Sequence, residues 1–208
     1  MASGASGRLD DLVRSLAAGE APSLPPIERW NPPDCGEIDI RIDREGVWHH
    51  EGRPIRRPAL VKLFASVLRH GGEGGGRYEL VTPAEKLGIR VEDAPLLAVE
   101  MQVAPSPAGE VLVFRTNLDD VVTCDADHPL RFDEQPGGAG PRPYIYVRRG
   151  LWARLTRPVY LDLAERARTR TVDGREMIGV ASGSSFFAMM PADALEDEAP
   201  AQTGEGTR

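Results

Sequence analysis

The first clear hydrophobic pattern in the chain has a period of two and predicts a β-hairpin. Ile38, Ile40 and Ile42 alternate with charged residues, as in a strand that buries only one face. Residues 44–46 (Arg-Glu-Gly) then supply a turn, and residues 47–48 (Val-Trp) begin the returning strand. We expect the tryptophan to fill the core of its half of the protein.

The period then changes to that of a helix. Pro58 suits a first helical position, and Gly71 stands just past the last apolar position of the pattern. The apolar positions between them form one helical stripe: Leu60, Val61, Leu63, Phe64, Val67 and Leu68. A weaker pattern predicts a second helix over residues 159–167.

The remaining patterned segments predict strands separated by breaks rich in glycine and proline. The expected strands are residues 78–82, 88–92, 96–103, 111–116, 120–125 and 144–148. Residues 117–119 (Asn-Leu-Asp) would form the turn of a second hairpin. The break APSPAGE, residues 104–110, indicates an interdomain joint.

The two ends of the chain differ in composition from the middle. Residues 6–18 predict a short amphipathic helix. Residues 21–33 carry five prolines, which predicts an extended arm anchored by Ile27 and Trp30. After Met190 the chain is acidic and rich in small residues, and this composition predicts disorder.

Two stretches of the chain resemble each other and predict an internal duplication. Residues 46–55 read GVWHHEGRPI and residues 150–159 read GLWARLTRPV, so the glycine, the tryptophan and the Arg-Pro pair recur. Later in each copy, Leu-Gly-Ile at residues 87–89 is matched by Ile-Gly-Val at residues 178–180.

The duplication and the breaks together predict how the chain is organised. We expect an α+β protein with two related domains, each a bent antiparallel sheet with one helix. The expected ranges are 1–34 for the N-terminal helix and proline-rich arm, 35–104 for the first repeat, 105–190 for the second repeat and 191–208 for a disordered acidic tail.

Composition and charge exclude several classes of protein. The 208 residues are 41% hydrophobic and 27% charged, which suits one large or two small globular domains. A net charge of −7 gives no broad basic field, so we expect no bulk duplex nucleic-acid binding and no membrane binding. The first residues lack a secretory signal and no apolar run is long enough to span a membrane, so we expect a cytoplasmic protein.

Two segments that contain histidine are candidates for metal or catalytic chemistry. The His-His-Glu run at residues 49–51 could ligate a metal, but neighbouring strand residues point to opposite faces, so we favour a surface hairpin. Asp125, Asp127 and His128 follow an apolar strand and could serve a metal-dependent hydrolase. The chain continues in an extended form after them, which favours a turn with exposed carboxylates.

Charged and hydrogen-bonding residues beside strand ends form the candidate ligand site. The set is Glu92, Asp93, Asn117, His128, Arg131 and Arg148. The arginines would meet a negative charge, the amide and imidazole would make directional hydrogen bonds, and the carboxylates would accept from hydroxyls or ring amines. These groups could instead be solvated or paired across a domain interface, whereas clefts between domains are a usual location of ligand sites.

Several motifs, in order along the chain, resemble those of a bacterial family, the domain of unknown function 1285. They are WNPPDCGEIDIRI (30–42), GxPIxRPxLVxLF (52–64), YELVTPxEK (78–86), VEDAP (91–95), TNLDD (116–120), DADHPLR (125–131) and YVR (146–148). The resemblance implies a duplicated α+β core whose C-terminal half is similar to a pleckstrin-homology-like fold. It also implies a role in signalling or regulation and a ligand site between the halves that suits a nucleotide-like molecule, but it brings no established activity.

We therefore predict a non-enzymatic, cytoplasmic, ligand-binding protein with a regulatory or signalling role. Its ligand would be small and anionic, with nucleotide-like molecules among the candidates, and would bind in the cleft between the domains without a cofactor or a metal. Two alternatives stay open. One is the metal-dependent hydrolase, and the other is a protein-interaction module that uses the proline-rich arm, an exposed sheet edge or the acidic tail.

Overall fold

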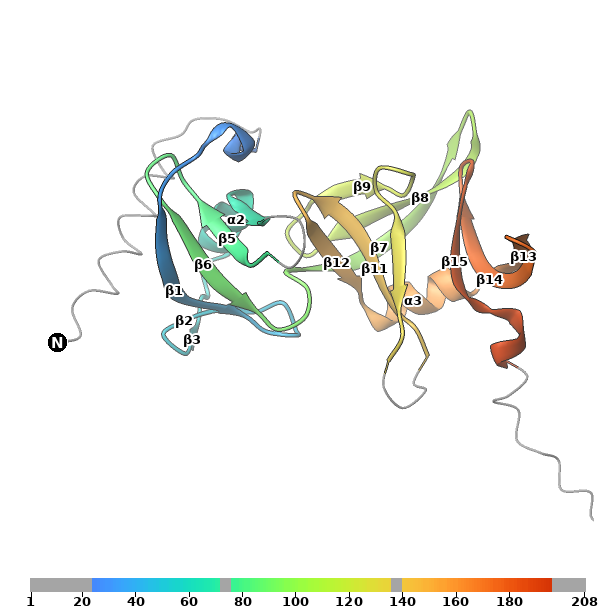
Figure 1. Ribbon diagram of the computed structural model, residues 1–208. Helices are drawn as coiled ribbons and strands as arrows, with labels where there is room; N and C mark the ends of the chain where they lie inside the picture. The colour runs from blue at the N-terminus through green and yellow to red at the C-terminus, as the bar shows by residue number, and fades with distance from the viewer. Residues whose placement is uncertain (1–23, 72–75, 136–139, 196–208) are drawn as a thin grey trace, which may run out of the picture.

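The chain folds into two halves built on sheets, and the second half ends with a smaller third sheet (Figure 1). The fold was analysed in a computed structural model, which describes residues 24–71, 76–135 and 140–195. We call residues 24–94 the first half and residues 95–195 the second half. One continuous core of buried side chains runs through both halves.

The first half is a six-stranded sheet with one helix. Its elements are η1 (Ile27–Arg29), β1 (Asp34–Ile42), β2 (Trp48–His50), β3 (Arg53–Pro54), α2 (Pro58–Ser66), β4 (Leu68–His70), β5 (Tyr78–Val81) and β6 (Lys86–Val91). The strand order is β3-β2-β1-β6-β5-β4. Only β1 and β6 are parallel, and the other neighbouring strands are antiparallel.

The second half begins with another six-stranded sheet. Its elements are β7 (Leu96–Ser106), β8 (Gly109–Thr116), β9 (Val121–Thr123), β10 (Leu130–Asp133), β11 (Arg142–Arg148), β12 (Leu151–Leu155) and α3 (Arg157–Ala164). The strand order is β10-β11-β12-β7-β8-β9, with β12 and β7 as the parallel pair. Each large sheet is therefore mixed, whereas we expected purely antiparallel sheets.

The third sheet is an antiparallel meander at the C-terminal end. It consists of β13 (Arg168–Val172), β14 (Arg175–Ser182) and β15 (Ser185–Pro191), and η2 (Ala192–Leu195) follows. In Figure 1 this sheet lies beyond α3, on the side of the second half that is away from the first half.

The period-two pattern of β1 is confirmed in the core. Ile38, Ile40 and Ile42 are all buried, and Trp48 on the returning strand is only 1% exposed. The Trp48 ring stacks on Phe64 of α2, with 6.1 Å between the ring centroids. The predicted anchors of the proline-rich arm also hold, because Ile27 is fully buried and Trp30 packs against the core.

Helix α2 begins at Pro58 as predicted but ends earlier, at Ser66. The apolar stripe suggested a continuation to Leu68, which instead opens β4 and pairs with Leu80 of β5. This pairing satisfies the backbone groups of β4 and keeps Leu68 fully buried. Both outcomes bury leucine, and the helical period alone does not distinguish them.

A hairpin followed by a helix occurs in both halves, as the duplication predicted, and three strands that were not all predicted follow each helix. Both helices begin with an Arg-Pro pair, at residues 57–58 and 157–158. The proline at 158 therefore corresponds to Pro58 by its place in the structure. The sequence match had paired it with Pro54, which lies in β3, a short strand with no counterpart in the described residues of the second half.

The expected joint at residues 104–110 lies in the hairpin between β7 and β8. The chain passes from the first sheet to the second at residues 92–95. Proline and glycine mark a reversal of the chain, but they do not show whether it joins two strands or two domains. The predicted helix at residues 6–18 and most of the predicted tail, residues 196–208, fall outside the described residues. In the part of the chain that is described, no helix is long and apolar enough to cross a membrane.

Candidate ligand pocket between the two halves

A pocket of about 240 Å³ lies where the two halves meet. Its lining comes from β4, β5, the segment that joins the halves, and strands β10 to β12. The lining residues are His70, Tyr78, Asp93, Ala94, Arg131, Tyr144, Gly150 and Trp152. Four of the eight have aromatic rings, and two carry a formal charge of opposite sign.

The second half supplies one wall of the pocket, and the register of β10, β11 and β12 determines which side chains form it. Arg131 lies opposite Tyr144, which lies opposite Arg154 on the next strand. The alternate positions Leu130 and Ile145 are buried in the core. Since successive strand residues point to opposite faces, one face of these strands builds the core and the other presents aromatic and cationic groups.

The Arg131 guanidinium lies over two aromatic rings. Its guanidinium carbon lies 4.4 Å from the centroid of the Trp152 ring and 4.9 Å from that of Tyr144. Its Nε lies 2.8 Å from a carboxylate oxygen of Asp133. Its two Nη groups make no hydrogen bond to any described residue. The cation–π contacts hold the guanidinium beside the rings and leave these donors for a ligand.

Asp93 provides the negative charge of the pocket. The Tyr144 hydroxyl donates to its Oδ1 at 2.7 Å, and Oδ2 lies 3.0 Å from Nε of Arg154 and 3.7 Å from Nη1 of Arg142. Burial, reinforced by the hydrogen bond to Asp93, raises the pKa of Tyr144 to about 12. The phenol therefore keeps its proton at neutral pH and holds the carboxylate in position.

The first half supplies the opposite wall. His70 and Tyr78 are cross-strand partners on β4 and β5, and their rings meet edge to face with 4.7 Å between centroids. Burial raises the pKa of Tyr78, the Arg131 charge opposes this shift and the Asp93 charge reinforces it. Charges of the second half and of the connecting segment thus influence the pKa of a tyrosine in the first half. The two sides of the pocket are therefore electrostatically coupled.

The turn between β11 and β12 docks the second half against the first. The Arg149 carbonyl accepts from the backbone N–H of His70 at 3.0 Å, and the Arg149 guanidinium donates to the Ser66 carbonyl at 2.8 Å. The same side chain contacts Glu28 and is only 12% exposed. Gly150 follows with a φ of 74°, and a Cβ at this position would lie 2.9 Å from the Cβ of His70.

Of the six residues predicted for the ligand site, the structure brings Asp93 and Arg131 together in this pocket. Glu92 forms an ion pair with Arg41 on the surface of the first half. The Asn117 side chain accepts from the backbone N–H of Leu97 at 3.0 Å and lines a different, more apolar depression.

The last two predicted residues also lie outside the pocket. Arg148 sits in the interface between the halves, 3.2 Å from Asp120 and 3.4 Å from the carbonyl of Ala65. His128 lies beside Tyr146, with 6.2 Å between ring centroids. Sequence reasoning missed the four aromatic residues of the lining. The alternation of Tyr144 and Tyr146 in β11 was a usable signal, but it does not show which face of the strand becomes the pocket.

The hydrolase candidates form a local turn. Asp125 accepts from the backbone N–H groups of Asp127 and His128 at 2.9 and 2.8 Å, and its carboxylate lies 3.4 Å from Nδ1 of the His128 ring. An aspartate that accepts from the backbone two and three residues ahead is a common way to stabilise a turn. This geometry accounts for the motif as a hydrogen-bonded turn.

Of the paired histidines of the first hairpin, His49 is likewise accounted for by a local contact. Nε2 of His49 lies 2.8 Å from Oδ2 of Asp43, whose other oxygen accepts from the backbone N–H of Val47. The contact between His49 and Asp43 therefore stabilises the β1–β2 turn. Across the described ranges, no group of three or more histidine, cysteine, aspartate or glutamate side chains is placed to hold a metal ion.

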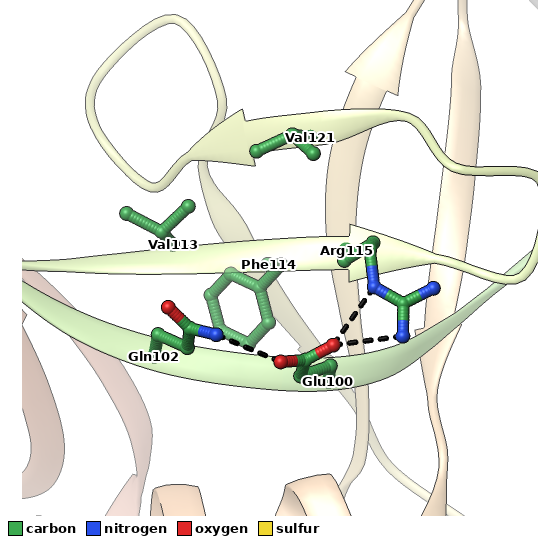
Figure 2. Close-up of a pocket in the computed structure, with 6 residues that line it drawn as sticks. All are labelled: Glu100, Gln102, Val113, Phe114, Arg115 and Val121. Atoms are coloured by element: carbon green, nitrogen blue, oxygen red, sulfur yellow. Dashed lines mark hydrogen bonds and ion pairs between the residues drawn. The ribbon is translucent and has the colours of Figure 1, made fainter.

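A further depression, on β7, β8 and β9, is drawn in Figure 2. Glu100 accepts there from Gln102 and from Arg115, at 2.7 and 2.8 Å. Both hydrogen bonds lower the pKa of the Glu100 carboxyl. The polar side chains of this surface, Glu100, Gln102 and Arg115, thus pair with one another.

Comparisons with known proteins place these features in a family. Residues 25–94 match the DUF1285 N-terminal domain, described as a domain of unknown function, and residues 95–189 match the DUF1285 C-terminal domain, described as a protein of unknown function. The boundary between these matches coincides with the change of sheet. No match was found among curated proteins.

Two solved structures are similar. A DUF1285 family protein from Silicibacter pomeroyi DSS-3 is 39% identical, with a TM-score of 0.77, covering 89% of this chain and 97% of that chain. A DUF1285 family protein from Shewanella baltica OS155 is 29% identical, with a TM-score of 0.48, covering 61% of this chain and 90% of that chain.

Proposed function

The chain belongs to the DUF1285 family, and from its pocket we propose that it is a non-enzymatic regulatory protein that binds a small anionic ligand with a planar ring. The ligand would lie between the two halves, against the face of β10, β11 and β12. Binding there would connect the halves, because the lining comes from both.

The observation that carries this proposal is the placement of Arg131. A cation held over Trp152 and Tyr144 offers donors to a carboxylate or phosphate beside aromatic surfaces on which a planar ring can pack. Asp93 lies in the same pocket, and its oxygens can accept from a ring N–H or a hydroxyl in addition to their present partners.

The volume limits the size of the ligand. Pockets for small molecules usually measure about 300–1,000 Å³, and this one measures about 240 Å³. A small aromatic acid would fit within it, whereas a nucleotide-like molecule would place its base or its phosphate inside and the rest in solvent.

A thermal-shift panel tests the proposal. Nucleoside monophosphates and aromatic carboxylic acids should include stabilising compounds, and inorganic phosphate serves as the reference without a ring. A ligand at 100 times its dissociation constant should add about 2.7 kcal/mol of stability. Arg131→Gln should weaken its binding by about 1.5–3 kcal/mol, the usual contribution of a charged hydrogen bond.

Arg90→Gln is the matched control. Arg90 is an exposed arginine on β6 that pairs with Asp39 outside the pocket. It should leave ligand binding unchanged. A panel without any stabilising compound, or equal losses of affinity in both variants, would contradict the proposal.

A further inference from the structure

The outer edge of β13 is a second feature of the fold that suits a partner. β13 ends the third sheet, and its outer edge pairs with no other strand within the described residues. Residues 168–171 are all exposed, so both faces of the strand meet solvent. Such an edge presents backbone N–H and carbonyl groups that can pair with another extended chain.

The rest of the sheet is firmly attached to the six-stranded sheet of the second half. Ser182 at the end of β14 accepts from the backbone N–H of Leu112 at 2.9 Å and donates to the carbonyl of Cys124 at 2.6 Å. The backbone N–H of Gly183 donates to the carbonyl of Glu110 at 2.7 Å. Val180 is fully buried. β13 is therefore the exposed edge of an anchored sheet.

The arginines of β13 share one face of this sheet. Arg168 and Arg170 alternate with Thr169 and Thr171, so both arginines point to the same side. The guanidinium carbon of Arg170 lies 5.3 Å from the centroid of the Phe186 ring. Within the described chain, neither arginine has a carboxylate within 4.0 Å, although the protein carries a net charge of −7.

We propose that β13 binds an extended acidic peptide, which adds to the third sheet as a further strand. Main-chain hydrogen bonds to the free edge would give affinity, and acidic side chains at alternate positions would face Arg168 and Arg170. This surface belongs to the third sheet and shares no residue with the ligand pocket.

Two other occupants fit the surface less well. A second copy of the chain, paired antiparallel about Arg170, would place this arginine opposite itself, and like charges directly opposite destabilise a sheet. A single-stranded nucleic acid needs an open aromatic face for base stacking. The Phe186 ring, however, lies over Gly179 on one side and contacts Arg170.

The experiment measures binding of a fluorescently labelled peptide of alternating glutamate and threonine by anisotropy at low ionic strength. The test variant is Arg168→Glu with Arg170→Glu. The matched control is Arg44→Glu with Arg53→Glu, which makes the same charge change at two exposed arginines of the first half. Circular dichroism checks that both variants fold.

The proposal expects binding to the wild type and the control variant, and binding at least about tenfold weaker to the test variant. A peptide with the same side chains and N-methylated backbone amides should fail to bind, because it cannot pair with the edge. Amide hydrogen exchange in β13 should slow when the unmodified peptide is added.

Three results would overturn it. The first is no binding of the peptide to the wild type, in which case the arginines serve only to keep the edge from pairing. The second is equal binding of the N-methylated peptide, which would mean attraction by charge alone. The third is displacement of the peptide from β13 by a much lower concentration of oligothymidylate, which would identify nucleic acid as the occupant.

Discussion

Replacing Gly150 with alanine tests the close approach of the two halves. The added Cβ would lie 2.9 Å from the Cβ of His70 and 3.3 Å from the His70 carbonyl oxygen. Neither atom is the end of a flexible side chain, so the backbone of β4 or of the β11–β12 turn has to move. The backbone N–H of His70 donates to the carbonyl of Arg149 at 3.0 Å, and this hydrogen bond would be disturbed as well.

The expected loss of stability has two parts. An L-residue in the left-handed region costs about 1–2 kcal/mol, and Gly150 has a φ of 74°. Overpacking of a close contact adds about 1–3 kcal/mol. Gly150→Ala should therefore lower the free energy of unfolding by about 2–5 kcal/mol in total, which urea titration followed by tryptophan fluorescence can measure.

Gly174→Ala separates these two parts. Gly174 has a φ of 80°, but a Cβ there would meet nothing within 4 Å. The control should thus show only the cost of the backbone conformation, about 1–2 kcal/mol. Equal losses in the two variants would refute the contact between Gly150 and His70.

A His70→Gly background gives a second check. Removing the His70 Cβ removes the closest of the three contacts at Gly150. Gly150→Ala should then cost less than it does in the wild type, with a coupling energy of about 0.5–3 kcal/mol in a double-mutant cycle. An unchanged cost would show that the strain arises elsewhere.

Two further predictions follow from buried aromatic residues. Trp48→Ala should lower the free energy of unfolding by about 3–5 kcal/mol, because the side chain is only 1% exposed; a loss below about 1 kcal/mol in urea titration would mean that the ring is not in the core. The pKa of Tyr144, raised to about 12 by burial and by Asp93, favours the protonated phenol in the folded state. The stabilisation is fully present below the unfolded pKa of about 10 and is lost as pH rises through 12. In Tyr144→Phe that part of the alkaline loss of stability should disappear, and a wild-type loss complete by about pH 10 would contradict the assignment.

Local patterns were reliable guides where the pattern itself sets the structure. The alternation of Ile38, Ile40 and Ile42 selected the buried face of β1, and Pro58 marked the start of α2. The turn at residues 117–119 was also predicted, since β8 ends at Thr116 and β9 begins at Val121. Each of these features depends on a side-chain period or on a turn a few residues long.

The candidate site shows where local patterns fail. Asp93 and Arg131 were both predicted for the site and both line the pocket, whereas Glu92 pairs with Arg41 instead. Residues 92 and 93 lie in the bend between β6 and β7, where the direction of each side chain depends on the local path of the backbone and not on a strand period. The sequence contains both carboxylates but not the direction in which each points.

The sequence by itself determined the two α+β halves, the buried face of the first hairpin and the hairpin followed by a helix in each half. Only the tertiary structure decided that Leu68 belongs to a strand and that the β11–β12 turn docks on β4. It also decided that Arg131, Tyr144 and Trp152 share one side of a pocket. The reason is physical. Period and turn chemistry act within a few residues, whereas strand register and the contact between halves join residues far apart in the chain and exist only when both partners are folded.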